Sequence, residues 1–222
     1  MFRYIVGWLF LAVSVVAQAA VPVCKSFSQQ GREVTFHLDN GAAFQLKLCG
    51  QSVVRIWYSP DGKLQRLNSS FAVINEELED VGVVNVNEEA SCYEIFTPVL
   101  RIRVNKSPLK LQVFDKYQKL IFSDYGDGRT CEGEKKVEYK MLRRDEHFFG
   151  LGEKTGKLDR RGETYKMWNS DRPCSGVADD PLYKSIPFFM SNYRYGIFLD
   201  NTYKTEFKFG TESRDYYSFE AS

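Results

Sequence analysis

The sequence predicts an all-β protein, built as an antiparallel β-sandwich. Apolar and polar residues alternate over many short runs, and the clearest example is the pair 34–38 and 44–48, with the turn Asp39-Asn40-Gly41 between them. Side chains at i and i+2 share one face of a strand, so this alternation gives each strand one apolar face. Aromatic residues, which favour strands, make up 15% of the chain. No stretch of the sequence has a convincing period of 3.6 residues, which disfavours helices.

The other predicted strands follow the same rule and are separated by turn residues such as Ser59-Pro60-Asp61-Gly62. They cover residues 53–58, 100–104, 109–113, 119–122 and 137–141. Residues 195–199 and 203–209 are predicted to form a hairpin around Asp200-Asn201. Many short strands at this spacing are typical of an antiparallel sandwich or barrel.

Charge and composition exclude two classes of partner. The 222 residues suit one large domain, and 43% of them are hydrophobic, which is enough for a core. The 30 Lys and Arg residues nearly balance the 29 Asp and Glu residues, for a net charge of +1. This balance gives no electrostatic footprint for nucleic acid, and it argues against a polybasic protein of the membrane surface.

Residues 1–19 read as a secretory signal peptide. Arg3 supplies a positive charge, residues 5–16 are almost entirely apolar, and Ala17-Gln18-Ala19 has the small residues of a cleavage site. The alternative is an uncleaved N-terminal anchor, although the apolar run is shorter than the roughly 20 residues of a typical membrane span. We therefore expect a periplasmic or secreted protein whose mature domain covers residues 20–222.

The cysteines and histidines do not indicate a metal site. Five cysteines (Cys24, Cys49, Cys92, Cys131 and Cys174) leave at least one thiol without an intramolecular partner, and the sequence leaves their pairing open. No two are spaced as C-x-x-C, and the two histidines, His37 and His147, are far apart. We therefore expect no metal ligands and no cofactor.

Residues 150–187 break the strand pattern and form the candidate functional segment. They are rich in Gly, Pro, Asp, Asn and charged residues, and they include Tyr165, Trp168 and Tyr183. Long loops in compact domains are commonly functional. Aromatic rings pack on the apolar faces of a sugar while carboxylates accept hydrogen bonds from its hydroxyls, so this composition suits carbohydrate. The alternative is an ordinary exposed loop with a partly buried Trp.

Four ordered blocks, in this segment and just after it, carry a resemblance. They are FGLGEKTG at 149–156, YKMWNSD at 165–171, DPLYKSIPFF at 180–189 and YGIFLDN at 195–201. Together they resemble the N-terminal domain of bacterial α-glucosidases of glycoside hydrolase family 31. The specific match covers about residues 148–210, and the earlier strands fit this domain only as a pattern.

The resemblance implies a galactose-mutarotase-like β-sandwich that packs beside a catalytic (β/α)₈ barrel. In the family, one loop of the sandwich reaches over the barrel and an Asp in an N-x-D segment hydrogen-bonds the terminal glucose. That segment matches Asn169-Ser170-Asp171 here, so Asp171 is the first candidate substrate-binding residue. Trp168, Arg172 and Tyr183 are candidates because they lie near it in the sequence. A turn-capping role for Asp171 before Arg172-Pro173 is the alternative.

No residue of this chain is predicted to be catalytic. The family places its nucleophile and acid/base carboxylates on the barrel, the nucleophile in a W-x-D-M-N-E type segment that this sequence lacks. The first hypothesis is therefore the N-terminal domain of a retaining α-glucosidase that binds an α-glucoside oligosaccharide, with the barrel expected C-terminal to it. The second is a stand-alone secreted carbohydrate-binding module without catalysis. A third, a mutarotase-like epimerase, would need a histidine and a glutamate at the sugar.

Overall fold

The computed structural model describes residues 22–64, 72–133, 135–171, 180 and 182–221. The predicted signal peptide, Arg172 and Cys174 lie outside this range. The described residues form sixteen strands, with antiparallel pairing throughout, in three sheets. The predicted all-β antiparallel class is confirmed. No helix in the described part of the chain is long and apolar enough to cross a membrane.

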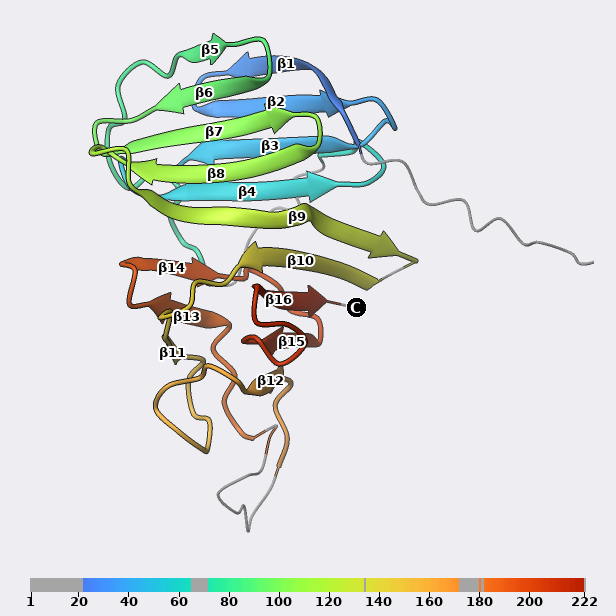
Figure 1. The fold of residues 1–222 in the computed structure, drawn as a ribbon, viewed down its shortest axis with the longest axis vertical. Helices are drawn as coiled ribbons and strands as arrows, with labels where there is room; N and C mark the ends of the chain where they lie inside the picture. Colours follow the sequence, from blue (N-terminus) through green and yellow to red (C-terminus); the bar gives the residue numbers. More distant parts are fainter. Residues whose placement is uncertain (1–21, 65–71, 134, 172–179, 181, 222) are drawn as a thin grey trace, which may run out of the picture.

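The upper lobe in Figure 1 is a two-layer sandwich. One layer is a four-stranded sheet of β1 (Cys24–Gln30), β2 (Glu33–Leu38), β3 (Ala43–Leu48) and β4 (Val54–Ser59). The other consists of β5 (Val86–Glu88), β6 (Cys92–Phe96), β7 (Leu100–Lys106), β8 (Leu109–Asp115) and the long β9 (Leu120–Glu132). The predicted hairpin at 34–48 is confirmed, because Phe36 pairs with Phe44 across β2 and β3.

The lower lobe continues the same large sheet beyond β9. Its strands there are β10 (Lys135–Met141), β16 (Tyr216–Ala221), β15 (Thr205–Lys208) and β12 (Thr164–Met167), which complete nine strands. A separate three-stranded sheet is made of β11 (Phe148–Gly150), β13 (Phe188–Ser191) and β14 (Tyr195–Phe198). Each lobe therefore has two layers (Figure 1).

The predicted hairpin of residues 195–199 with 203–209 is wrong. β14 pairs with β13, whereas β15 pairs with β12 and β16, so the two strands belong to different sheets. Ile197 and Phe207 contribute to the same core from these two sheets. The turn residues Asp200-Asn201 carry the chain from one layer to the other instead of folding it back within one layer.

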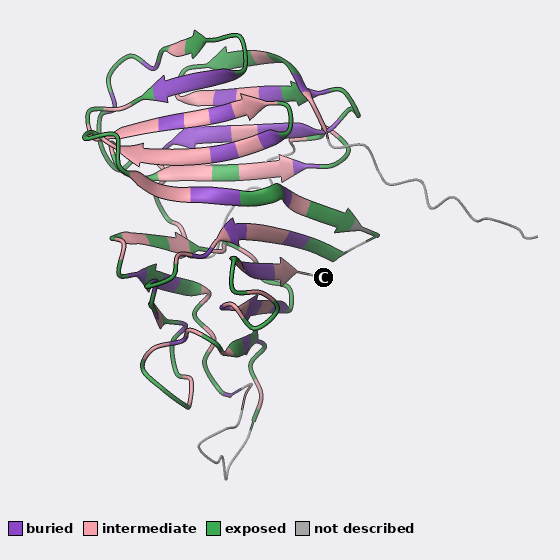
Figure 2. Ribbon diagram, in the orientation of Figure 1, coloured by how far each residue is buried: buried purple, intermediate pink, exposed green. Residues whose placement is uncertain are grey.

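Each lobe has its own apolar core. The upper core brings Phe36, Phe44 and Tyr93 together. The ring centre of Phe36 lies 6.2 Å from that of Phe44 and 5.3 Å from that of Tyr93. The lower core is mainly aromatic, and Phe148 and Phe189 pack edge to face at 5.6 Å. Burying one such ring contributes about 1.5–3 kcal/mol. Figure 2 shows buried residues along the strands and exposed ones along the lower loops.

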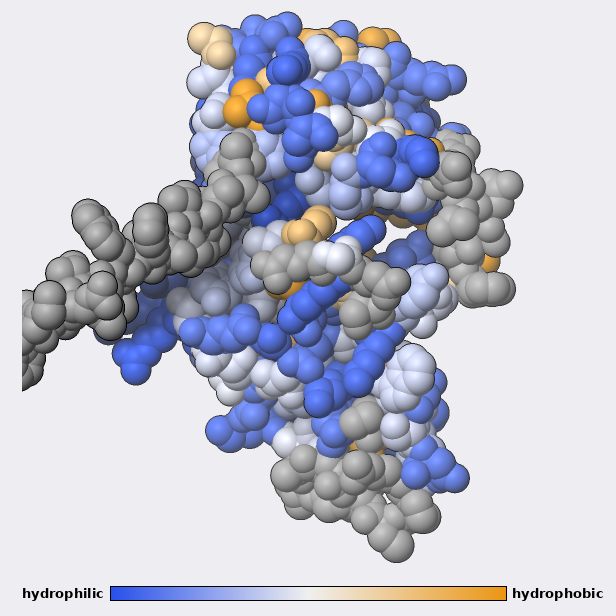
Figure 3. Space-filling model, turned by 90° about the vertical axis from the view of Figure 1, so that its right-hand side faces the viewer, coloured by the Kyte–Doolittle hydropathy of each residue, from blue (hydrophilic) through white to orange (hydrophobic). Residues whose placement is uncertain are grey.

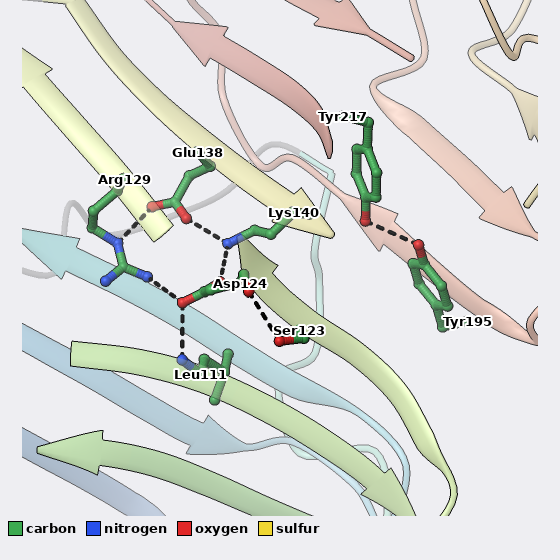
Figure 4. A network of polar contacts seen from close by, with 8 residues as sticks. All are labelled: Leu111, Ser123, Asp124, Arg129, Glu138, Lys140, Tyr195 and Tyr217. Carbon is green, nitrogen blue, oxygen red and sulfur yellow. Dashed lines mark hydrogen bonds and ion pairs between the residues drawn. The ribbon is translucent and has the colours of Figure 1, made fainter. Parts of the chain in front are cut away.

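A buried ionic cluster lies where the two lobes meet on the large sheet (Figure 4). The fully buried carboxylate of Asp124 on β9 accepts hydrogen bonds from Lys140 Nζ at 2.6 Å, Arg129 Nη2 at 3.2 Å and the Leu111 backbone N–H at 2.9 Å. Glu138 accepts from the same two cations, at 2.6 Å from Lys140 and 3.0 Å from Arg129. Two anions thus balance two cations, joining β8, β9 and β10.

The cluster lies where the pairing of β9 with β10 is irregular. The pairing of β9 with β10 shifts register between Glu138 and Lys140, and Gly128 has φ +79°. A Cβ at Gly128 would lie 2.7 Å from Asp124 Oδ2, so only glycine fits there. Burial raises the pKa of Asp124, but the Lys140 and Arg129 charges outweigh this effect and leave the pKa below its ordinary value.

Candidate functional site

The candidate loop, residues 151–187, connects β11 to β13 at the tip of the lower lobe (Figure 1). It includes the short strand β12, which adds to the edge of the large sheet through β15. The loop is therefore attached to both layers of the lower lobe, and its exposed residues project from a packed base.

The glycine-rich motif at its start fixes the direction of the chain. Gly150 has φ +128°, and a Cβ there would lie 2.6 Å from the carbonyl oxygen of Phe188, so any other residue would collide with β13. The next residue, Leu151, is fully buried and its N–H donates to the Phe188 carbonyl at 2.8 Å. This motif therefore anchors the start of the loop to β13.

Arg160 holds the first turn of the loop from inside. Its side chain is buried, and Nη1 donates to the carbonyls of Thr155 at 3.0 Å and Lys157 at 2.8 Å and to the Tyr165 hydroxyl at 3.1 Å. The guanidinium also lies 4.9 Å from the centre of the Tyr165 ring. A planar group with five donors can satisfy several carbonyls at once, which suits an irregular turn.

Lys154 and Asp180 form a clamp across the loop. The Lys154 side chain is 0% exposed, and Nζ donates to Asp180 Oδ1 at 2.7 Å and to the Lys166 carbonyl at 2.6 Å. Asp180 Oδ2 accepts the Lys166 backbone N–H at 2.5 Å. The clamp ties three points of the loop together at the end of β12. Sequence reasoning missed the roles of Lys154, Arg160 and Asp180, because nothing in their spacing predicts that the side chains of Lys154 and Arg160 are buried or that Asp180 pairs with Lys154.

Substituting Asp180 with Ala is expected to loosen the loop. It removes the acceptor of the Lys166 amide and leaves the Lys154 ammonium buried without its counter-charge, which costs about 3–5 kcal/mol. Thermal unfolding and amide exchange at Lys166 measure the effect, and exchange should speed up by about 10²-fold. The matched control is Glu153→Ala, since Glu153 pairs with Lys184 only at 4.0 Å on the surface. Equal effects of the two variants would contradict the clamp.

The structure brings three of the four predicted substrate-binding residues to one place. The Ser170 N–H donates to the Leu182 carbonyl at 3.0 Å, so the segment with Trp168 and Asp171 runs beside the segment with Tyr183. Trp168 is 54% exposed and Tyr183 43%, and Asp171 is also exposed. No hydrogen bond or ion pair joins Asp171 to another described residue. Arg172 lies outside the described residues.

This arrangement can contact a sugar. Exposed rings and a carboxylate can offer a stacking surface and hydrogen-bond acceptors. Within the described residues, no group of three or more His, Cys, Asp or Glu side chains could hold a metal ion. The histidines lie apart from each other, with His37 at 3.0 Å from Ser28 Oγ and His147 Nδ1 at 2.6 Å from Asp159.

The four described cysteines are free thiols. Cys24, Cys49 and Cys92 are buried and Cys131 is exposed. Burial raises the pKa of Cys24 to about 11, which keeps this thiol protonated and unreactive at neutral pH.

Comparison with known proteins agrees with this geometry. Residues 43–208 match the glycosyl hydrolase 31 N-terminal galactose mutarotase-like domain. A GH31 dextranase of Flavobacterium johnsoniae, solved with isomaltotriose, is 61% identical and superposes with a TM-score of 0.88 over 92% of this chain and 25% of the dextranase. Alpha-glucosidase 2 of Bacillus thermoamyloliquefaciens is 36% identical over 86% of this chain and 24% of its own length. A cycloalternan-forming enzyme of Listeria monocytogenes, at 21% identity and a TM-score of 0.79, shares the fold.

The first two relatives are much longer than this chain, which spans about a quarter of each. The family model covers strands of both lobes, from β3 to β15, together with the whole candidate loop. The two-lobed sandwich and its sequence thus agree, and the chain belongs to the glycoside hydrolase family 31 N-terminal galactose-mutarotase-like domain family.

Proposed function

We propose that this chain is the N-terminal domain of a retaining α-glucosidase and that its loop 151–187 forms part of the glucose pocket. The observation that carries the proposal is the exposed group of Trp168, Asp171 and Tyr183 on a loop whose base is held by buried Lys154 and Arg160. A base held in this way lowers the ordering cost of such side chains when the sugar binds. The substrate is an α-glucoside oligosaccharide.

The chemistry itself belongs to a (β/α)₈ barrel that follows this domain. Retention requires two carboxyl groups about 5–5.5 Å apart, one as nucleophile and one as acid/base. Hydrolysis then needs only these groups and water, so no cofactor enters the proposal. The apolar segment of residues 5–16 supports secretion or a periplasmic location. An open reading frame that continues into a W-x-D-M-N-E segment would support the barrel, and a stop codon after Ser222 would contradict it.

A chimera tests the contribution of the loop. Residues 22–222 replace the matching quarter of the Flavobacterium johnsoniae dextranase, and hydrolysis of isomaltotriose is measured. We expect the chimera to be active. A version with residues 168–183 replaced by a Gly/Ser linker should lose about 10²-fold or more in kcat/KM, because binding groups at the pocket act in the transition state. Equal activity of the two chimeras would contradict the proposal that the loop forms part of the glucose pocket.

The alternative function, a stand-alone carbohydrate-binding module, is favoured by the same exposed aromatic residues. It predicts that the isolated chain binds isomaltotriose or maltose well. The pocket-wall proposal predicts a Kd weaker than about 1 mM, because one wall supplies few contacts and 1 mM already corresponds to about −4.1 kcal/mol. Titration calorimetry or NMR titration of residues 22–222 separates the two.

A further inference from the structure

The outer face of the three-stranded sheet is apolar and carries no charge. β11, β13 and β14 contain no Asp, Glu, Lys or Arg. Phe148 and Phe189 point into the lower core, so their neighbours point outward. Strand pairing places Phe149 beside Met190 and Phe188 beside Phe198 on that outer face.

These outward side chains are exposed to solvent. Met190 is 52% exposed, Phe198 40%, Phe188 38% and the adjoining Ile186 51%. A Cβ at Gly196 would lie 2.8 Å from the Phe188 ring, so this ring packs against Gly196 of β14. The result is a contiguous apolar face, here called the apolar platform and defined by Phe149, Ile186, Phe188, Met190 and Phe198.

Sheets that face water normally carry polar residues outward. The four-stranded sheet of the upper lobe does so, with Thr35 and Gln45 paired on its outer face. The side of the molecule seen in Figure 3 is likewise mostly hydrophilic, with scattered apolar residues. A contiguous exposed apolar patch marks a contact surface.

The apolar platform runs into the base of the candidate loop. The Ile186 side chain packs at Gly152, where a Cβ would lie 2.9 Å from Ile186 Cγ1, and the Ile186 N–H points to the Leu151 carbonyl at 3.4 Å. A partner seated on the platform therefore lies directly beside the loop that carries Trp168 and Asp171.

We propose that the apolar platform is the docking surface for the catalytic part that the longer relatives carry. The dextranase at 61% identity has three-quarters of its length beyond the region that this chain matches, which is ample for a partner of this kind. The absence of charge on the platform fits a large, permanent and apolar contact. This assignment rests on the proposed function, because it places the candidate loop at the edge of a catalytic partner.

Oxidative footprinting of the chain and of the dextranase chimera tests the assignment. Hydroxyl radicals should oxidise Met190 about tenfold more slowly in the chimera than in isolated residues 22–222, since oxidation follows exposure. Tyr117, which is 78% exposed on the upper lobe, is the internal control and should react equally in both. Unchanged Met190 oxidation in the chimera would overturn the proposal. Protection that grows with concentration in the isolated chain, without further protection in the chimera, would assign the platform to a second copy and overturn it as well.

Paired lysine substitutions give a second test. Met190→Lys with Phe198→Lys should lower the thermal midpoint of the chimera by several degrees, because it buries charges without partners. The isolated chain should keep its midpoint, because the platform lies outside its own cores. The matched control, Thr35→Lys, should be neutral in both. Equal midpoints for the substituted and unsubstituted chimeras, or a chimera that stays insoluble with the platform intact, would count against docking.

The two proposals fail separately. If Met190 is protected in the chimera but Asp171→Ala leaves the activity of the chimera unchanged, the docking proposal is supported and the proposed role of Asp171 in the pocket is contradicted. If Asp171→Ala abolishes activity while Met190 stays fully reactive, the pocket role stands and the docking face lies elsewhere.

Discussion

Asp171→Ala in the dextranase chimera is expected to lower kcat/KM for isomaltotriose by about 10²-fold or more, the scale of losing one or two charge-assisted hydrogen bonds that strengthen in the transition state. Asp171 is exposed on the candidate loop, and an ionised carboxylate can accept hydrogen bonds from sugar hydroxyls. Initial rates at low substrate concentration give kcat/KM directly.

Two controls give this result its meaning. Glu77→Ala removes an exposed carboxylate from the upper lobe and should leave kcat/KM unchanged. Asp171→Asn keeps the shape but loses the charge, so it should fall between the native chain and the alanine variant. If Asp171 only caps a turn, Asp171→Ala would lower the thermal midpoint and leave kcat/KM unchanged. That result would contradict the proposal that Asp171 binds the sugar.

Asp124→Ala is expected to destabilise the domain by about 3–5 kcal/mol, because it leaves Lys140 and Arg129 buried with one carboxylate between them. Asp124 is fully buried, and the Lys140 side chain is 4% exposed. Denaturant unfolding of residues 22–222 measures the loss. Glu163→Gln, which breaks a 4.0 Å surface pair with Lys157, is the control and should cost about 1 kcal/mol or less. A loss no larger than that of the control would contradict the cluster.

The Asp124 carboxylate makes the free energy of unfolding depend on pH. The folded-state pKa of Asp124 is lowered, so its contribution is complete above the unfolded-state pKa of about 3.9 and is lost as the pH falls through the lower folded-state value. Asp124→Ala should therefore flatten this acid limb. An unchanged acid limb in the variant would show that other carboxylates govern it.

Alternation in the sequence was enough to predict the all-β class and the first hairpin. Alternation of period two in residues 34–48, with Asn40-Gly41 between the strands, leaves little freedom, because a register slip would turn Phe36 and Phe44 into solvent. Ordered blocks such as those at 149–156 and 165–171 also sufficed to identify the family, which the family model confirms.

The pairing of the later strands and the burial of several charges could not be predicted from the sequence, because both depend on long-range packing. Residues 195–199 and 203–209 have the pattern of a hairpin, yet they lie in opposite layers, because an apolar face can be covered by either sheet and local pattern does not choose between them. Lys154, Asp124 and Arg160 look like ordinary surface residues in the sequence. Their burial depends on partners 26, 16 and 5 residues away, such as Asp180, Lys140 and Tyr165, which only the folded chain brings within hydrogen-bonding distance.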